Sequence, residues 1–263
     1  MNKLDKKLEE IKQKKKIGLM AHVIVGYPSI EETITIVKTM NDSGVDIVEL
    51  QIPFSDPLAD GPTIMRACEK SLENGTKVKD AFIVMKRLSS EVSVPLLFMA
   101  YYNTVFRYGV EQFCKDAADS GASGLIVPDM AIEEEGEEHF YAFCKQYGLH
   151  AIQVVSPAST EERLKKNAAI VNGFVYCTAR QGITGAKDAL DRTLSSYLKK
   201  MRKYFSLPIA VGFGISKKEH ITALTDQADI AVIGSAVIDL INTSPKEKMH
   251  ENIRRFFTEI MVQ

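Results

Sequence analysis

The sequence predicts an α/β fold: a single (β/α)8 barrel over residues 1–263, with an extra helix at its N-terminus. Eight short apolar runs alternate with amphipathic helical patterns, and this alternation is typical of a parallel sheet. No Ser/Gly-rich or low-complexity stretch divides the 263 residues, which are enough for eight strand–helix units. An open, doubly wound sheet fits the same pattern, because periodicity does not show whether a sheet closes.

The expected strands are placed by the apolar runs and by the turns before them. Gly44 and Gly121 each follow a helical pattern and precede an apolar run, as expected for glycine ending a helix. The Ser-x-x-Glu spacing of a capping box marks several helix starts, at Ser29, Ser159, Ser216 and Ser244. The strands are expected near residues 19–25, 47–52, 94–100, 124–127, 151–155, 173–177, 208–212 and 230–234.

Composition argues against several classes of function. The chain is 25% charged with a net charge of -1, so it has no general field for nucleic acid or anionic lipid. Its start is too charged for a signal peptide, and its longest apolar run is too short to span a bilayer; we expect a cytoplasmic location. The 4 cysteines and 5 histidines lack metal-ligand spacing, so no metal is expected.

The segment that starts at Glu49 carries the most specific chemical signal. Strand side chains alternate between faces, so Glu49 and Gln51 share the face of Ile47, opposite Val48 and Leu50. A carboxylate that faces inward loses hydration, which raises its pKa toward the range useful for proton transfer. Neutralisation of Glu49 by a buried arginine or lysine is the alternative interpretation.

Prolines stiffen the loop that follows this strand. Pro53, Pro57 and Pro62 restrict the backbone and so fix the directions of Asp56 and Asp60. Asp60 becomes a second candidate acid, on a loop rather than in a strand. Two carboxylates in unlike environments can ionise differently, as acid/base chemistry requires.

Further candidates lie at the carboxyl ends of the strands, where barrels place catalytic groups. Gly214 follows the seventh strand, and Gly234 and Ser235 follow the eighth. Backbone N–H groups there, with a helix N-terminus at Ser235, would suit a phosphate; tight turns are the alternative. Residues 179–187 suggest either a lid over the site or an ordinary loop.

The chain resembles the tryptophan synthase alpha subunit family. The most specific shared motif is Pro-Phe-Ser-Asp-Pro-Leu-Ala-Asp-Gly-Pro, residues 53–62, and further blocks occur in the expected order along nearly the whole chain. They are Gly26-Tyr27-Pro28, Tyr101-Tyr102-Asn103, residues 124–129, 182–185 and 212–215, and Gly234-Ser235. The family cleaves indole-3-glycerol phosphate to indole and glyceraldehyde 3-phosphate, a retro-aldol reaction that needs no cofactor.

The resemblance implies a role for each candidate. Glu49 would be the acid/base, and Asp60 would hold the indole N–H and stabilise positive charge on that nitrogen. The residues expected to contact substrate are His22, Tyr101, Tyr176, Phe213 and, in the lid, Thr184. Those expected to hold the phosphate are Gly185, Gly214, Gly234 and Ser235.

The resemblance also implies a partner. The family works with a pyridoxal-phosphate beta subunit in an alpha2-beta2 heterotetramer, and indole passes to it through a tunnel. Pro53, Asp56 and Pro57 would lie at that interface. The pyridoxal phosphate belongs to the partner, so no cofactor is expected in this chain. The N-terminal helix would close the bottom of the barrel.

Two polar residues near the expected indole site depart from the family pattern. Gln51 stands where glycine is usual, and His22 where phenylalanine is common. We expect the Gln51 amide to donate to the Glu49 carboxylate and lower its pKa. Two other functions stay open: another phosphate-binding barrel enzyme, such as a sugar-phosphate isomerase, or a weakened barrel that mainly activates a beta subunit.

Overall fold

The strands close into a barrel. The computed structural model describes residues 2–178, 187–212 and 214–261. Each strand pairs in parallel with the next, and β8 pairs with β1, so the (β/α)8 prediction is confirmed and the open sheet is wrong. The strands are β1 (Gly18–Ile24), β2 (Ile47–Gln51), β3 (Leu96–Met99), β4 (Gly124–Ile126), β5 (His150–Val155), β6 (Val175–Thr178), β7 (Ile209–Gly212) and β8 (Ile230–Ile233).

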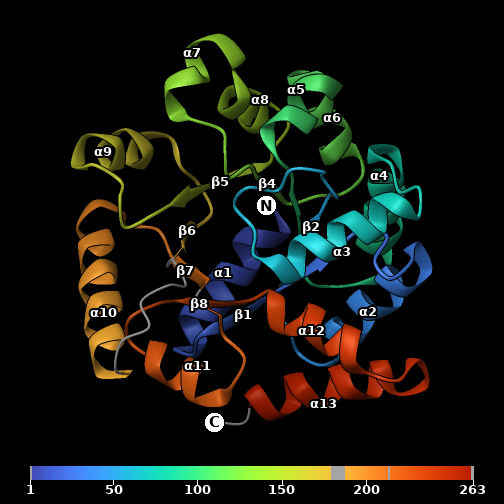
Figure 1. Cartoon of the computed structure of the whole chain (residues 1–263). Coiled ribbons are helices and arrows are strands. Elements are labelled where there is room, and N and C mark those ends of the chain that lie inside the picture. Colours follow the sequence, from blue (N-terminus) through green and yellow to red (C-terminus); the bar gives the residue numbers. More distant parts are fainter. Residues whose placement is uncertain (1, 179–186, 213, 262–263) are drawn as a thin grey trace.

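Helices surround the strands in chain order (Figure 1). They are α1 (Lys3–Lys14), α2 (Ile30–Asp42), α3 (Pro62–Glu73), α4 (Val78–Glu91), α5 (Tyr102–Tyr108), α6 (Val110–Asp119), α7 (Glu135–Glu138), α8 (Phe140–Gln146), α9 (Glu161–Ile170), α10 (Lys187–Tyr204), α11 (Lys218–Leu224), α12 (Ser235–Thr243) and α13 (Met249–Met261), with short 3-10 turns at Ile132–Glu134 and Lys246–Lys248. None of the helices in the described residues is both long and apolar enough to cross a membrane.

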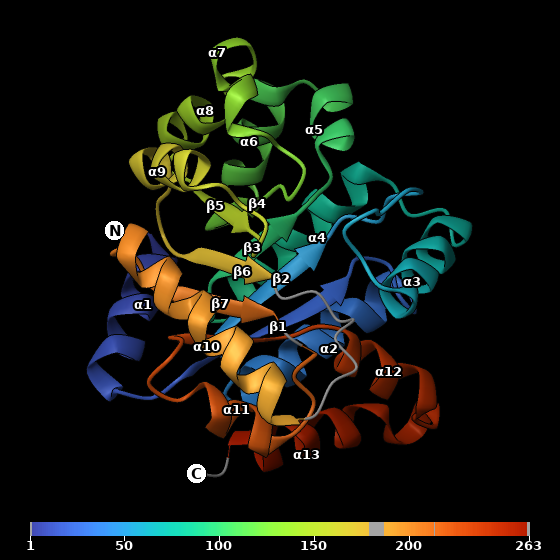
Figure 2. The same cartoon turned by 60° about the vertical axis from the view of Figure 1, so that its left-hand side comes forward.

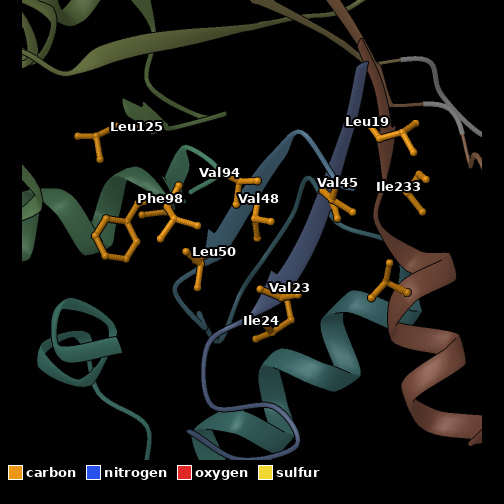
Figure 3. Close-up of a cluster of buried hydrophobic side chains, with 14 of the residues drawn as sticks. Leu19, Val23, Ile24, Val45, Val48, Leu50, Val94, Phe98, Leu125 and Ile233 are labelled. Carbon is orange, nitrogen blue, oxygen red and sulfur yellow. The ribbon is translucent and has the colours of Figure 1, made fainter. Parts of the chain in front are cut away.

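The two faces of each strand build two separate apolar clusters. Val48, Leu50 and Phe98 point outward and pack under the helices, as Figure 3 shows. Ile47 and Leu97 point inward and fill the barrel interior. Both faces of the strands are therefore buried, which is why their sequences are nearly continuous apolar runs. Polar residues on the inner face of β1 and β2, such as Glu49, are therefore largely shielded from water.

Helix α1 lies across the end of the barrel where the strands begin (Figure 2). Leu4 is fully buried and Ile11 nearly so, both in the interior cluster. The Asn2 side chain donates to the backbone oxygens of Ser123 and Gly148, at 2.8 and 3.0 Å, just before β4 and β5. The expectation that this helix closes the bottom of the barrel is confirmed.

Helix starts were predicted less well than strands. Ser29 caps α2 as expected, accepting from the N–H of Glu32. Helix α9 instead starts after Thr160, whose hydroxyl accepts from the N–H of Arg163. Helix α11 starts after Lys217, and Ser244 ends α12 rather than beginning a helix. At α9 a neighbouring hydroxyl takes the free N–H group, and α11 starts without a side-chain cap, so the spacing alone misplaces these helix starts.

We predict that Leu4→Ala lowers the free energy of unfolding by about 2–5 kcal/mol, because it leaves a cavity where the N-terminal helix meets the barrel interior. Urea denaturation measures the change. Ile83→Ala is the control, since Ile83 on α4 is 63% exposed and its loss should cost under about 0.5 kcal/mol. Equal effects of the two substitutions would show that α1 is not part of the core.

Candidate active site

The predicted catalytic residues meet at the carboxyl ends of the strands, opposite α1. Glu49 and Gln51 lie on β2 and point inward, as the alternation predicted. Asp60 lies in the loop between β2 and α3. Tyr101 directly precedes α5, and Tyr176 lies on β6. The structure therefore brings together residues from four separate segments of the chain.

Glu49 is buried and paired with a histidine. Its Oε1 contacts Nδ1 of His22, the register partner of Glu49 on β1. The two residues are 4% and 3% exposed, so water hardly screens their interaction. The alternative of a buried arginine or lysine is wrong, since among the described residues His22 is the partner of Glu49. The other carboxylate oxygen, Oε2, is buried and has no hydrogen-bond partner in that part of the chain.

The pair changes the protonation of the imidazole. Burial alone would lower the pKa of His22, because it penalises the charged ring. The charge and hydrogen bond of Glu49, with smaller contributions from Asp60 and Gln51, outweigh burial and raise the pKa of His22 above its ordinary value. The ring is therefore protonated over a wider pH range than a free histidine.

Two hydrogen bonds hold one oxygen of the Asp60 carboxylate. Its Oδ2 accepts from Nε2 of Gln51 at 2.7 Å and from the hydroxyl of Tyr101 at 2.9 Å. The same hydroxyl accepts from the N–H of Ala59 at 3.0 Å, which ties the loop to the end of β3. Burial raises the pKa of Asp60, and the charge of His22 and these two hydrogen bonds offset that rise only in part.

The predicted partner of Gln51 is wrong. Gln51 is fully buried and points into the barrel, as expected, but its amide donates to Asp60 instead of Glu49. Residues 49 and 51 lie on the same face of one strand at different heights, and the loop after β2 brings Asp60 to the height of Gln51. Gln51 therefore acts on the loop carboxylate, while His22 occupies the place beside Glu49.

Aromatic rings line the space next to the carboxylates. Tyr101 stacks on Phe54 with ring centroids 5.3 Å apart, and both belong to the interior cluster or pack on it. Tyr176 packs on the same cluster. Burial and the negative charges of Glu49 and Asp60 raise the pKa of Tyr176 far above its ordinary value, so its hydroxyl stays neutral.

The glycines expected to hold a phosphate lie near these side chains. Gly234 is the N-cap of α12, and Ser235 is its first residue. A Cβ added to Gly234 would lie 3.8 Å from Cβ of His22, which places the start of α12 beside the Glu49 pair. Gly214 has a φ of +62°, a conformation that favours glycine. Free N–H groups at the first turn of α12 can bind an anion.

Three predicted residues, Phe213, Thr184 and Gly185, lie outside the described residues, as does most of the predicted lid. In the part of the chain that the structure describes, no three His, Cys, Asp or Glu side chains are grouped so that they could hold a metal ion.

The loop between β2 and α3 has a buried side and an exposed side. Pro53 and Pro57 are buried, whereas Asp56 is exposed and Leu58 is 94% exposed. A surface groove of about 690 Å³ runs beside the loop along α3. It is lined by Ser55, Pro57, Pro62, Met65, Arg66, Glu69, Leu72 and Glu73.

Comparison with known proteins decides the family. The family described as Tryptophan synthase alpha chain matches residues 8–261. The chain belongs to this family. The resemblance seen in the motifs is confirmed, and with it the enzyme class, a lyase of the tryptophan synthase alpha chain type.

Individual relatives agree with this assignment. The tryptophan synthase alpha chain of Desulfotalea psychrophila is 46% identical over 239 residues, 91% of this chain and 93% of that protein. That of Petrotoga mobilis is 39% identical over 97% of this chain and 99% of its own length. The crystal structure of the alpha subunit from Legionella pneumophila superposes with a TM-score of 0.90 at 28% identity, covering 99% of this chain and 97% of that one.

Two features of the site were missed at the level of sequence. The first is the His22–Glu49 contact, since the alternation of strand residues does not reveal which residue of β1 lies opposite Glu49. The second is the stacking of Phe54 on Tyr101. An aromatic residue inside a proline-stiffened loop after an inward-facing strand is a signal that could have indicated the second.

We predict that Tyr101→Phe raises the pKa of Asp60 further, because it removes a hydrogen bond that favours the ionised carboxylate. The variant therefore keeps Asp60 protonated to a higher pH. Carbon-13 NMR titration of the Asp60 carboxyl measures the shift. Tyr108→Phe is the control, because its hydroxyl donates to Asp116 between α5 and α6. An unchanged Asp60 titration in Tyr101→Phe would contradict the assigned hydrogen bond.

Proposed function

We propose that this chain cleaves indole-3-glycerol phosphate to indole and glyceraldehyde 3-phosphate, with Glu49 as acid/base and Asp60 as the group that holds the indole nitrogen. One observation carries the assignment. A buried carboxylate lies inside the barrel next to a second carboxylate in a different environment, and one of its oxygens, Oε2 of Glu49, has no partner among the described residues. Membership of the tryptophan synthase alpha chain family supports the reaction.

The proton steps use Oε2 of Glu49. The carboxyl group protonates the indole carbon that bears the side chain, and the resulting carboxylate then takes the proton of the neighbouring hydroxyl group. The carbon–carbon bond breaks with this second transfer, so indole leaves with the first proton and the hydroxyl carbon becomes the aldehyde. Glu49 ends the cycle protonated, and no external acid, base or oxidant is consumed.

Asp60 stabilises the charge that develops on the ring. Protonation of the ring carbon leaves positive charge on the indole nitrogen, and a nearby carboxylate lowers the energy of that state. Gln51 and Tyr101 both donate to Oδ2 of Asp60. This arrangement fixes the carboxylate and leaves Oδ1 for the indole N–H. The rings of Tyr101 and Tyr176 would bound the indole.

The phosphate end of the substrate would lie at the start of α12. We assign its binding to backbone donors of Gly214, Gly234 and Ser235, together with Gly185, and the closing of the site to a lid that carries Thr184. The closeness of Gly234 to His22 supports this, because the glycerol part of the substrate must reach from the phosphate to the Glu49 pair.

We further propose an alpha2-beta2 complex with a beta subunit that carries pyridoxal phosphate and receives the indole. The exposed face of the loop after β2, with Asp56 and Leu58 beside the groove along α3, is the proposed contact surface. The buried prolines 53 and 57 would set the course of this loop rather than touch the partner. A cytoplasmic location fits the cysteines, all of which are free and buried.

We predict that Glu49→Gln abolishes indole release while the protein stays folded. The amide keeps the shape of the side chain but does not exchange a proton, and loss of a general acid/base costs on the order of 10²–10⁴ in rate. Single-turnover indole release from indole-3-glycerol phosphate measures the effect. Wild-type turnover in this variant would contradict the mechanism.

The same assay separates the proposed function from the two alternatives. Indole release by the wild-type chain alone, increased by a beta subunit, supports the lyase. A chain that stimulates a beta subunit without releasing indole would be mainly an activator. A chain that does neither but isomerises a sugar phosphate would be another phosphate-binding barrel enzyme.

Asp60→Asn should lower the maximal rate rather than weaken substrate binding. The amide oxygen still accepts from the indole N–H, but it brings no charge to the cationic ring, an interaction made only in the transition state. Steady-state kinetics measure kcat and KM separately. A raised KM with an intact kcat would reassign Asp60 to substrate positioning alone.

We predict that Leu58→Asp weakens binding to the beta subunit about tenfold, the effect typical of losing one apolar anchor at an interface centre. Titration of the beta subunit, followed by the stimulation of indole release, measures the affinity. Indole release by the chain alone should stay unchanged, since Leu58 faces solvent. The control is Ile83→Asp, an exposed aliphatic residue on α4. Equal losses for the two variants would place the interface elsewhere.

A further inference from the structure

Two polar side chains, His22 on β1 and Gln51 on β2, lie beside the two carboxylates of the site. Neither of them carries a negative charge. His22 contacts Oε1 of Glu49 through Nδ1, and Gln51 donates to Oδ2 of Asp60 at 2.7 Å. The register of the sheet pairs His22 with Glu49 and Ile24 with Gln51, so His22 lies diagonally across from Gln51. All three residues on the strands are almost fully buried. Each carboxylate therefore has its own polar neighbour inside the barrel.

The two polar neighbours also face each other. Nε2 of His22 and Oε1 of Gln51 are buried atoms without a hydrogen-bond partner among the described residues. The Gln51 amide nevertheless favours the protonated imidazole, which places the two groups close together. Buried polar atoms of complementary type are rarely left apart, because an unsatisfied one is costly. A hydrogen bond from Nε2 of the protonated His22 to Oε1 of Gln51 would complete the row Glu49, His22, Gln51, Asp60.

We propose that His22 and Gln51 are positioning residues that join Glu49 and Asp60 into one titrating unit. This inference rests on the proposed function, in which those two carboxylates perform the chemistry. His22 holds one oxygen of Glu49 and leaves Oε2 for the substrate. Gln51, which does not titrate, holds Asp60 through its amide and adds to the direct effect of the His22 charge on that carboxylate. Protons then belong to the unit rather than to a single residue.

The surroundings of this unit contain few other charges. Among the described residues, the titratable groups near it are Tyr101 after β3, Tyr176 on β6 and Cys68 on α3. All three keep their protons, because burial and the nearby carboxylates raise their pKa values well above the ordinary ones. On the β8 side its neighbour is Gly234, which carries no charge. Within the described residues, no lysine or arginine pairs with Glu49 or Asp60. The charge of the unit is therefore set by its own members.

The protonated ring of His22 determines the direction in which the pH dependence of the site changes. A protonated His22 favours the carboxylate form of Asp60, because its positive charge opposes the rise in pKa that burial causes in that group. Because its pKa is raised, His22 loses its proton only as the pH rises above the ordinary histidine range. Loss of that proton removes this stabilisation of the Asp60 carboxylate. A neighbour that does not titrate cannot produce this change in the alkaline part of the pH profile.

Three substitutions test the unit, and each removes a different property of His22 or Gln51. His22→Phe removes both the donor and the charge. His22→Asn keeps a donor near the position of Nδ1 but holds no proton. Gln51→Met keeps the length of the side chain and removes its amide. His250→Asn is the control, since His250 pairs with Glu32 outside the barrel. Circular dichroism establishes that each variant is folded.

The first measurement is the dependence of kcat and kcat/KM on pH. We expect His22→Phe to move the acidic limb of kcat/KM to higher pH, and both His22 variants to lose the alkaline step that the imidazolium produces. His22→Asn should keep a KM close to that of the wild type, because the donor to Glu49 remains. A pH profile in His22→Phe identical to that of the wild type would overturn the inference.

The second measurement needs no turnover. Nitrogen-15 NMR follows the His22 ring, and carbon-13 NMR follows the Asp60 carboxyl, in the substrate-free chain. We expect Glu49→Gln to lower the pKa of His22. We expect Gln51→Met to raise the pKa of Asp60 and to make the His22 step in its titration smaller, since the direct effect of the His22 charge remains. The inference is wrong if Glu49→Gln leaves the His22 titration unchanged, or if Gln51→Met leaves the Asp60 titration unchanged.

These results separate the two proposals. If Glu49→Gln stops indole release but the NMR titrations are independent of one another, the proposed function stands and the linked unit fails. If Glu49→Gln releases indole at the wild-type rate, the proposed function fails, whatever the titrations show. Coupled titrations together with the shifted acidic limb support both.

Discussion

The alternation of side chains around a closed, doubly buried sheet is the constraint on which the site depends. Every second residue of a strand must point into the barrel, and neighbouring strands lie about 4.8 Å apart, so inward residues at the same level touch. His22 and Glu49 are such a pair, because β1 and β2 align them in register. Strand register therefore sets the surroundings of Glu49, and the loop after β2 adds Asp60 and Phe54.

Burying a carboxylate in this way is costly, and the arrangement shows how the cost is limited. A charge removed from water needs an opposite charge and hydrogen bonds, and breaking such a pair is more damaging than replacing it by apolar residues. His22 supplies both for one oxygen of Glu49, and Gln51 and Tyr101 supply the hydrogen bonds of Asp60. The interior cluster beneath, from Met20 to Val232, provides the stability that the polar layer lacks.

The sequence predicted the fold closely because local patterns determine it. The strand at Ile47–Gln51 lies within one residue of its expected bounds, and the inward direction of Glu49 follows from alternation alone. The partners of these residues could not be predicted in the same way. His22 is 27 residues from Glu49, so their contact depends on the register between two strands. The partner of Gln51 depends on the course of the loop that carries Asp60.

Helix starts also divide into those that the sequence predicts correctly and those that it does not. Ser29 has no competing hydroxyl beside it on the helical side, and its capping was predicted correctly. At Ser159 the next residue, Thr160, also bears a hydroxyl, and it takes the role of cap. A spacing rule cannot decide between adjacent residues of the same chemistry, since the choice follows from how the preceding turn folds.

The attachment of α1 to the base of the barrel has a consequence for how the protein is made. The Asn2 side chain binds backbone oxygens that lie 121 and 146 residues later in the chain, and the strand after α1 pairs with β8. Helix α1 leaves the ribosome before the segments that it contacts, so Leu4 and Ile11 lack their apolar neighbours until those segments follow. Contacts so distant in sequence slow folding, and apolar surface exposed meanwhile favours aggregation. The apolar face of α1 thus stays exposed until the strands that cover it have been made.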